Sequence, residues 1–163
     1  MNFRSYHSEE DYWRIRNYLR EVFQLNKCFE YSWHVARLDY WRWHMILNCR
    51  VYESIQKVTT IWETEEKQIA GVLHPIGPGE IRLHVHPHFR SAALEDEMLL
   101  QAEVQLPVQW EDGHRILYLP VFTHDVMRQE ILTQRGYVKG QGLGYHWRRD
   151  LETSIPENLL PPG

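Results

Sequence analysis

The first third of the chain places apolar residues at helical spacing. A short β-type segment spans residues 3–7, and Ser8 then stands where a helix N-cap is expected. Residues 9–23 and 35–48 each carry an apolar side chain every three or four positions, which predicts two amphipathic helices. These positions are Tyr12, Ile15, Leu19, Val22 and Phe23 in the first helix and Leu38, Trp41, Met45 and Leu47 in the second.

The middle of the chain has strand patterns instead. β-branched and aromatic residues fill residues 58–63, 68–74 and 81–85. A charged turn at 65–67 separates the first two segments, and Pro-Ile-Gly-Pro-Gly at 75–79 is expected to break the chain sharply before the third. Three consecutive strands are therefore predicted.

The last part alternates helix and strand again. We expect a helix over 94–106, a strand over 115–122 with Tyr118 in its middle, and a final strand over 144–149. Asp125 can cap the helix between those two strands, and Gly136 can end it. Its expected core residues are Val126, Ile131 and Leu132.

The predicted order is β-α-α-β-β-β-α-β-α-β, which indicates a mixed α/β (α+β) domain with a central sheet flanked by helices. The length of 163 residues fits one domain, which we assign to residues 1–150. Residues 151–163 are proline-rich and non-periodic, as in a linker or tail that could lead to a second domain.

Composition narrows the function classes. A net charge of −4 without a long basic run gives no electrostatic footprint for nucleic acid. No apolar run approaches the ~18 residues of a membrane span, and the N-terminus has no signal-peptide pattern. Cys28 and Cys49 lie far apart and form no metal-binding or disulfide framework. These features favour a cytoplasmic protein.

Three histidines alternate along the third strand and its end. His84, His86 and His88 would share one strand face, where imidazoles can chelate zinc. Pro87 interrupts the strand, however, and no acidic or cysteine partner lies at a telling spacing, so no metal site is predicted. His84 or His86 could instead line a pocket as a general base.

The aromatic residues near position 40 have two interpretations. At helical spacing Trp41 should face the core, whereas Trp43 points elsewhere and could line a binding cleft, as could Trp33. Tyr118 stands in the middle of a predicted strand, where a tyrosine usually packs in the core.

Two segments carry a family resemblance. Residues 85–95, VHPHFRSAALE, form a strand end, a loop and a helix start, a junction that gathers backbone N–H groups into an anion site. Residues 131–138, ILTQRGYV, form a helix end and a glycine-aromatic turn. In this order they resemble the cofactor loop (V-x-P, then R-x-x-G-x-G/A) and closing helix of the GNAT superfamily of acyl-CoA-dependent N-acetyltransferases, over residues 1 to about 150.

The resemblance implies transfer of an acyl group from acetyl-CoA or another acyl-CoA to a small-molecule or peptide amine. Backbone amides of the strand that ends at Val85 would polarise the thioester carbonyl. The base would be His84, Glu63 or a water chain, and Tyr118 could act as a substitute acid. The cofactor-binding residues would be Val85, Arg90, Ser91, Ala92, Ala93 and Leu94.

The sequence departs from the family at both functional signatures. Glu95 stands at the last glycine or alanine position of the loop, where a carboxylate is expected beside the phosphates. Leu132 stands where many members have a tyrosine that protonates the leaving thiolate, and Asp125 replaces a frequent asparagine. The alternative is therefore a non-catalytic domain that supports an active partner, either a second GNAT domain joined through 151–163 or a homodimer partner.

Overall fold

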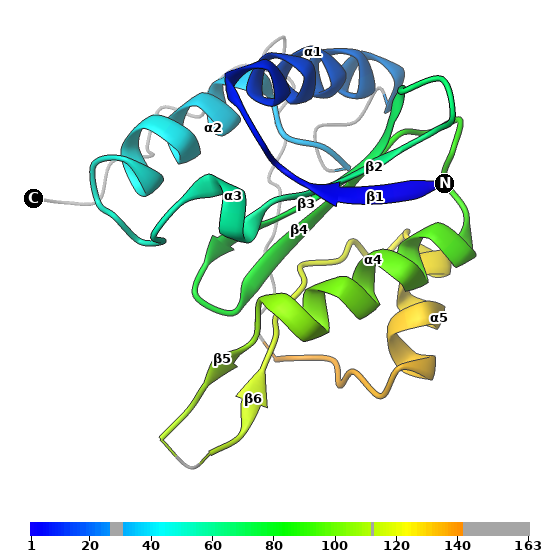
Figure 1. Ribbon diagram of the computed structural model, residues 1–163. Helices are drawn as coiled ribbons and strands as arrows, with labels where there is room; N and C mark the ends of the chain where they lie inside the picture. The colour runs from blue at the N-terminus through cyan, green and yellow to red at the C-terminus, as the bar shows by residue number, and fades with distance from the viewer. Residues whose placement is uncertain (27–30, 112, 142–163) are drawn as a thin grey trace, which may run out of the picture.

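The computed structural model describes residues 1–26, 31–111 and 113–141. Its centre is a four-stranded antiparallel sheet in the order β1-β2-β3-β4 (Figure 1). Short turns join β2 to β3 and β3 to β4, and such neighbours are expected to be antiparallel; β1 pairs with β2 after a long helical connection. The strands are β1 (Asn2–Ser5), β2 (Thr60–Glu63), β3 (Ile69–Gly77) and β4 (Glu80–Val85).

Helices cover both faces of the sheet. On one face lie α1 (Glu9–Asn26) and α2 (Val35–Tyr40), which continues as the π-helical segment η1 (Trp41–Ile46). On the other lie α4 (Ala92–Gln105) and α5 (Val126–Gln134), and a single turn, α3 (Ile55–Val58), precedes β2. Figure 1 shows α1 and α2 above the sheet and α4 and α5 below it.

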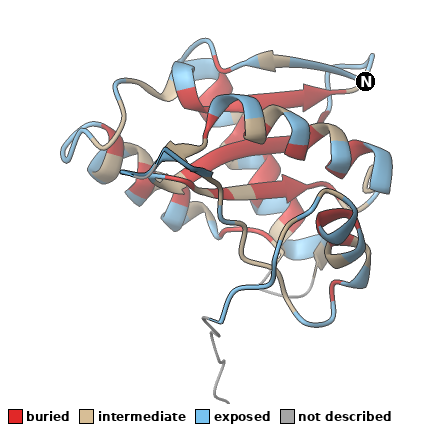
Figure 2. Cartoon of the chain, turned by 90° about the horizontal axis from the view of Figure 1, so that it is seen from below, coloured by how far each residue is buried: buried red, intermediate tan, exposed pale blue. Residues whose placement is uncertain are grey.

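The alternation of side chains along β3 decides what each helix layer meets. Gly71 faces α4, where a Cβ atom would come within 2.9 Å of the Met98 sulfur. His74 lies three residues after Gly71 on β3, and an odd separation along a strand places two side chains on opposite faces. His74 therefore faces the other helix layer and lies against Trp33 and Trp41. Figure 2 shows the resulting buried band through the sheet and the inner sides of the helices.

Most predicted elements are confirmed, with two shifts of boundary. Val58 ends the short helix α3 rather than opening a strand. Pro75 does not break the chain, because β3 continues through an irregularity to Gly77 before the turn. Proline is tolerated there because the N–H direction alternates along β3, so position 75 points toward β2, whose first residue, Thr60, is already paired with Leu73.

The predicted strand over 115–122 is wrong in extent. Its first two residues form β6 (Arg115–Ile116), which pairs with β5 (Val108–Gln109) in a small hairpin. Within the described residues, its remainder makes one parallel bridge, between Tyr118 and Glu80. Val126, expected in the core, is exposed. The predicted strand over 144–149 and the proline-rich segment lie outside the described residues.

No helix in the described part of the chain is long and apolar enough to cross a bilayer.

Candidate functional site

The start of β4 pairs with an incomplete parallel strand, which leaves a gap beside the rest of β4. Tyr118 donates its backbone N–H to the Gly79 carbonyl (2.6 Å), and Ile81 donates its own to the Tyr118 carbonyl (2.9 Å). The next donor in a parallel ladder would be residue 120, aimed at the Ile81 carbonyl. That residue is Pro120, which has no N–H. Pairing therefore stops after one bridge, and β4 continues without this neighbour.

Two backbone amides of β4 point toward the gap between β4 and residues 117–121, which is called the opening below. His86 donates its N–H to Ala70 on β3, and the N–H direction alternates along a strand. The N–H groups of Leu83 and Val85 consequently face the side of residues 117–121. Neither group has a backbone partner there within 1–26, 31–111 and 113–141. The sheet thus offers two hydrogen-bond donors at the opening.

Helix α4 begins seven residues after β4 ends, and one side of its first turn faces solvent. Ser91 is the N-cap, and its hydroxyl accepts from the Leu94 N–H (3.2 Å). Ala92 and Ala93 are exposed, whereas the side chain of Leu94 is buried in the core. The N–H groups of a helix's first turn and its dipole together favour an anion.

Glu95 does not lie where the sequence comparison places it. Its side chain is fully buried, with its two oxygens 2.6 Å from Arg90 Nε and 2.6 Å from Arg128 Nε. Arg90 also bonds Asp125 through Nη2 (2.6 Å). The four groups neutralise one another. The expected carboxylate beside the phosphates is therefore absent from the exposed side of the loop.

This ion network fixes Arg90 in place. Burial lowers the pKa of Arg90, but the hydrogen bonds that it donates to Glu95 and Asp125 outweigh that effect and raise the pKa. The guanidinium also lies 5.3 Å from the ring of Tyr31, which precedes α2. Arg90 can thus add positive potential near the loop while its hydrogen bonds go mainly to the network.

His84 and His74 form a buried pair under α2. Their Nε2 atoms are 3.0 Å apart, and His74 Nδ1 is 3.1 Å from the Pro75 carbonyl. Because a carbonyl only accepts, His74 carries its proton on Nδ1 and accepts at Nε2. His84 therefore donates from Nε2, and its Nδ1 keeps a free lone pair. That buried atom has no partner in the described part of the chain.

Both imidazoles are held neutral. Burial lowers the pKa of His74 to about 4 and lowers the pKa of His84 well below its usual value, with further lowering by His74 and nearby arginines. A neutral His84 can accept a hydrogen bond at pH 7. Of the histidines considered from the sequence, this one combines burial with an unused acceptor.

His86 and His88 are placed differently. His86 Nδ1 accepts from the His88 N–H (3.2 Å), and its Nε2 lies 3.4 Å from a Glu21 oxygen. His88 is exposed. No group of three potential metal ligands occurs among the described residues.

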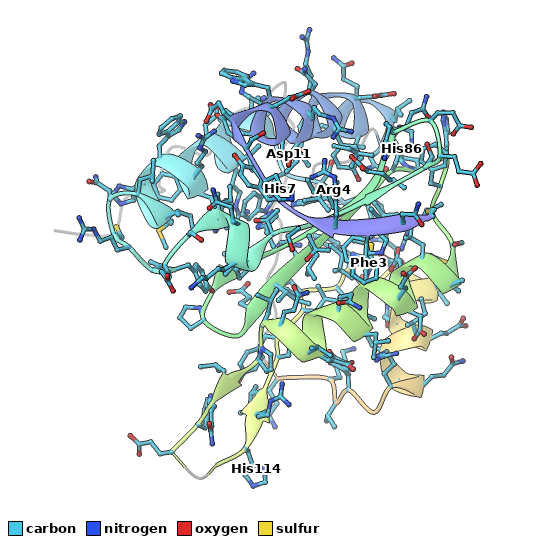
Figure 3. All side chains as sticks on the ribbon, in the orientation of Figure 1. Phe3, Arg4, His7, Asp11, His86 and His114 are labelled. Carbon is cyan, nitrogen blue, oxygen red and sulfur yellow. The ribbon has the colours of Figure 1, made fainter. Side chains whose placement is uncertain are left out.

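Glu63 belongs to an ion network at the other side of the sheet. Its Oε1 lies 3.0 Å from Arg4 and 2.7 Å from Arg14, and Arg4 also bonds Asp11, as Figure 3 shows between β1 and α1. Burial raises the pKa of Glu63, but hydrogen bonds from both arginines outweigh it and lower the pKa. Glu63 is occupied and separated from β4 by β3, which does not favour it as a base.

Tyr118 is exposed rather than buried. Its bridge partner is Glu80 at the start of β4, five residues from Val85, or roughly 16 Å along a strand. This position does not favour Tyr118 as an acid near the end of β4. Leu132 is buried on α5 and offers no hydroxyl.

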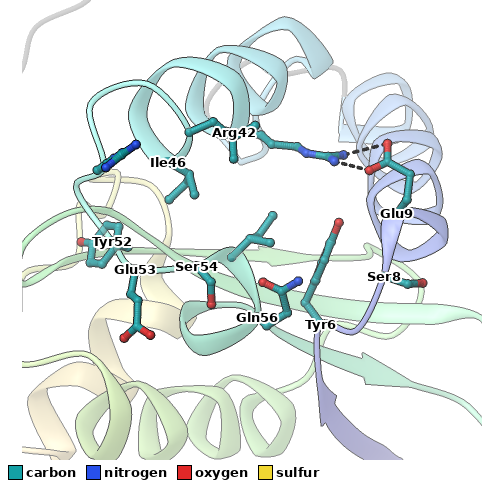
Figure 4. Close-up of a pocket in the computed structure, with 12 residues that line it drawn as sticks. Tyr6, Ser8, Glu9, Arg42, Ile46, Tyr52, Glu53, Ser54 and Gln56 are labelled. Atoms are coloured by element: carbon teal, nitrogen blue, oxygen red, sulfur yellow. Dashed lines mark hydrogen bonds and ion pairs between the residues drawn. The ribbon is translucent and has the colours of Figure 1, made fainter.

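A separate pocket of about 650 Å³ lies between the start of α1, the end of η1 and α3 (Figure 4). Arg42 crosses it to pair with Glu9 and also stacks 3.9 Å from the Tyr12 ring. None of the site residues predicted from the sequence lines this pocket. Trp43 is exposed beside Arg42, and Trp33 lies in the histidine cluster.

Sequence reasoning missed three residues of the site: Pro120, Arg128 and His74. Pro120 carried a readable signal, because proline inside a predicted strand ends its ladder. Arg128 carried none, since it meets Glu95 across 33 positions of the chain. His74 lies at the end of a hydrophobic strand pattern, which indicates only a buried position. Its contact with His84 becomes apparent only when the pairing of β3 with β4 is known.

Comparison with known proteins agrees with this architecture. No family model and no curated protein matches the sequence. Among solved structures, a probable acetyltransferase superposes with a TM-score of 0.56 and 11% identity over 92% of this chain and 99% of its own. A chimera of the spermidine N-acetyltransferase SpeG from Vibrio cholerae and hSSAT gives 0.55 and 12% over 86% and 83%. A second such chimera gives 0.50 and 16% over 86% and 82%. The chain has the fold of the GNAT acetyltransferases.

Proposed function

We propose that this chain binds an acyl-CoA at the opening between β4 and residues 117–121 and transfers its acyl group to an amine. The single observation that carries the proposal is the parallel pairing that begins at the start of β4 and ends at Pro120, which leaves the rest of β4 without this neighbour up to the loop before α4. The opening supplies donors for a carbonyl, and the helix supplies donors for phosphates.

The residues fit such a co-substrate, which would supply an activated thioester. The N–H groups of Leu83 and Val85 would donate to the thioester carbonyl. Those of Ala92 and Ala93 would donate to the pyrophosphate, because Ser91 already occupies the Leu94 N–H. Each donor is backbone, so the fit does not depend on the glycines of the family loop.

We assign to His84 the role of binding the amine that receives the acyl group. Its Nδ1 lone pair can accept a hydrogen bond from the amine nitrogen and orient it. Leu132 has no proton to give, so the leaving thiolate would receive its proton from the attacking amine through water. Acid catalysis by a side chain is not part of the proposal.

A second function remains a candidate because Leu132 leaves the buried side of α5 without a proton donor at that position. A non-catalytic domain with this fold would keep the anion site or lose it without consequence, and would support an active partner domain or a second copy. The tandem arrangement through residues 151–163 and the cytoplasmic location remain predictions from the sequence.

Calorimetric titration of acetyl-CoA and CoA tests the site directly. We expect low-micromolar binding by the parent chain. Ala93→Glu adds a carboxylate to the first turn, which favours the helix but repels phosphate, and should weaken binding by about tenfold or more. Leu100→Glu adds the same charge to an exposed position further along α4 and should leave binding unchanged.

Absence of binding by the parent, or equal loss in both variants, would contradict the proposed cofactor site. Release of CoA thiol in the presence of amines then separates the two functions. Turnover supports the transferase, whereas tight binding without turnover over a broad amine panel supports the non-catalytic domain.

A further inference from the structure

Polar side chains gather around His84 on the face of the sheet that α2 covers. His74 and His84 stack at 5.0 Å between ring centroids, Trp33 lies 4.4 Å from His74, and Arg37 lies 4.9 Å from the Trp33 ring. Arg82 is the cross-strand partner of His74 and shares the face of His84. These five residues are called the β4 cluster below.

The charges of the β4 cluster are all positive. Arg82 is half-buried, and burial, followed by the like charge of Arg37, lowers its pKa. Neither Arg82 nor Arg37 has an ion pair in the described part of the chain, and Glu80, on the same strand face, makes none with Arg82. A desolvated guanidinium without a counter-ion is unfavourable. An acidic group would supply the missing charge.

Three polar atoms of the cluster are buried and have no hydrogen-bond partner among the described residues. They are Arg82 Nε, Trp33 Nε1 and His84 Nδ1. The first two are donors, and the tautomer derived above makes the third an acceptor. Buried polar groups normally have partners, and a molecule that accepts at one point and donates at another would satisfy all three atoms.

The spacing suits one small molecule. Residues two apart on a strand lie roughly 6.6 Å apart, so Arg82 and His84 can meet two groups of the same ligand. A carboxylate accepts hydrogen bonds from a guanidinium and an indole N–H. An amine donates to an imidazole lone pair. A molecule with both groups complements the set.

We propose that the acceptor of this chain is a primary amine that also carries a carboxylate, such as an amino acid, with the carboxylate at Arg82 and the amine at His84. The role as acceptor rests on the proposed acyl transfer. The preference for an acid is independent of it, because it comes from the unpaired cations. A polyamine, the substrate named for SpeG, brings only further positive charge to Arg37 and Arg82.

Binding to the free chain, without any acyl-CoA, tests the inference. Each common α-amino acid is titrated by calorimetry alongside the amine that its decarboxylation yields, with spermidine as a polycation. We expect at least one amino acid to bind ten times more tightly than its own amine, and spermidine not to compete.

The variants assign that preference to a residue. Arg82→Gln should abolish it, and Arg37→Gln, at an exposed position that tolerates substitution, should weaken it severalfold. Arg20→Gln removes the same charge from an exposed surface position of α1 and should leave it intact. Thermal unfolding of each variant verifies the fold.

Equal or tighter binding of the plain amines, tight spermidine binding, or equal effects of Arg20→Gln and Arg37→Gln would overturn the inference. The outcome is separate from that of the acyl-CoA titration. If the chain binds amino acids selectively through Arg82 but does not bind acyl-CoA, the proposed ligand is supported and the proposed acyl transfer is contradicted. If the chain transfers acyl groups to amines that lack a carboxylate and not to amino acids, acyl transfer is supported and the proposed preference for an amino acid is contradicted.

Discussion

Substitution of Glu95 by glutamine tests the buried ion network that underlies the cofactor loop. Glu95→Gln keeps the shape of the side chain and removes its charge. Two cations, Arg90 and Arg128, would then share the one remaining carboxylate, Asp125. The substitution should therefore destabilise the fold. The sequence alone suggests the opposite, namely that removing the carboxylate at position 95 would restore a cofactor-binding loop.

The size of the effect follows from exposure. The side chain of Arg128 is 7% exposed and that of Arg90 is 24% exposed. Removing one partner of a buried pair costs about 3–5 kcal/mol, and the partial exposure of Arg90 places this case toward the lower value. For a domain of this size each kcal/mol shifts the melting temperature by about 2–4 °C. The expected loss is roughly 6–15 °C.

Thermal and urea unfolding, followed by circular dichroism, measure the change. Asp96→Asn is the matched control, because Asp96 is adjacent, exposed and paired with Arg135 at the surface. It should cost no more than about 1 kcal/mol. A further Arg128→Met in the Glu95→Gln background removes the stranded cation and should recover part of the loss. A Glu95→Gln variant that melts within about 2 °C of the Asp96→Asn control would refute the reasoning.

Three further results are expected. Pro120→Ala restores an N–H opposite the Ile81 carbonyl, so the ladder should extend, with unchanged or higher thermal stability and weaker acyl-CoA binding by calorimetry; unaltered binding would count against the opening as the site. The pKa of His74 is about 4 in the fold, so as pH falls from about 6.5 to 4 the unfolded chain takes up the proton first. The free energy of unfolding should therefore drop by roughly 3 kcal/mol between pH 7 and pH 4, measured by urea unfolding; a flat profile would contradict the neutral pair. Gly71→Ala places a methyl group 2.9 Å from the Met98 sulfur. The end of the Met98 side chain can shift, so the loss in urea unfolding should be at the low end of overpacking, about 1 kcal/mol, and Met98→Leu beside it should change that loss if the contact is the cause.

Periodicity was sufficient for the elements that carry their own amphipathic pattern. Helices α1, α4 and α5 and strands β3 and β4 lie close to their predicted places, because each buries a face that its own sequence repeats. The exception, residues 115–122, has a strand-like composition but contains Pro120, and its pairing is limited by a missing N–H rather than by side-chain preference. The local sequence pattern does not show whether the missing N–H of Pro120 or the apolar residues around it decide the length of the strand.

The site itself was only partly predictable, because its features depend on long-range partners. His84 was identified as a base candidate from its strand position, yet its free Nδ1 follows only from His74 and the Pro75 carbonyl on the neighbouring strand. Glu63 and Tyr118 have suitable chemistry in the sequence. Their places in the fold, in an arginine network and at the far end of β4, come from pairings that no local pattern encodes.

Glu95 illustrates why a position in a motif does not settle the direction of a side chain. A helix turns by 100° per residue, so the first turn of α4 exposes Ala92 and Ala93 and directs position 95 inward, in line with Met98 and Ala102. The carboxylate therefore lies in the core stripe of the helix and needs a buried cation, which Arg128 of α5 provides. The same turn can hold an anion on its outer side while its inner side contains an acid, because the two sides are separated by the helix backbone and the inner acid is already neutralised. An acidic residue in this loop thus bears on the stability of the α4–α5 pair before it bears on the cofactor.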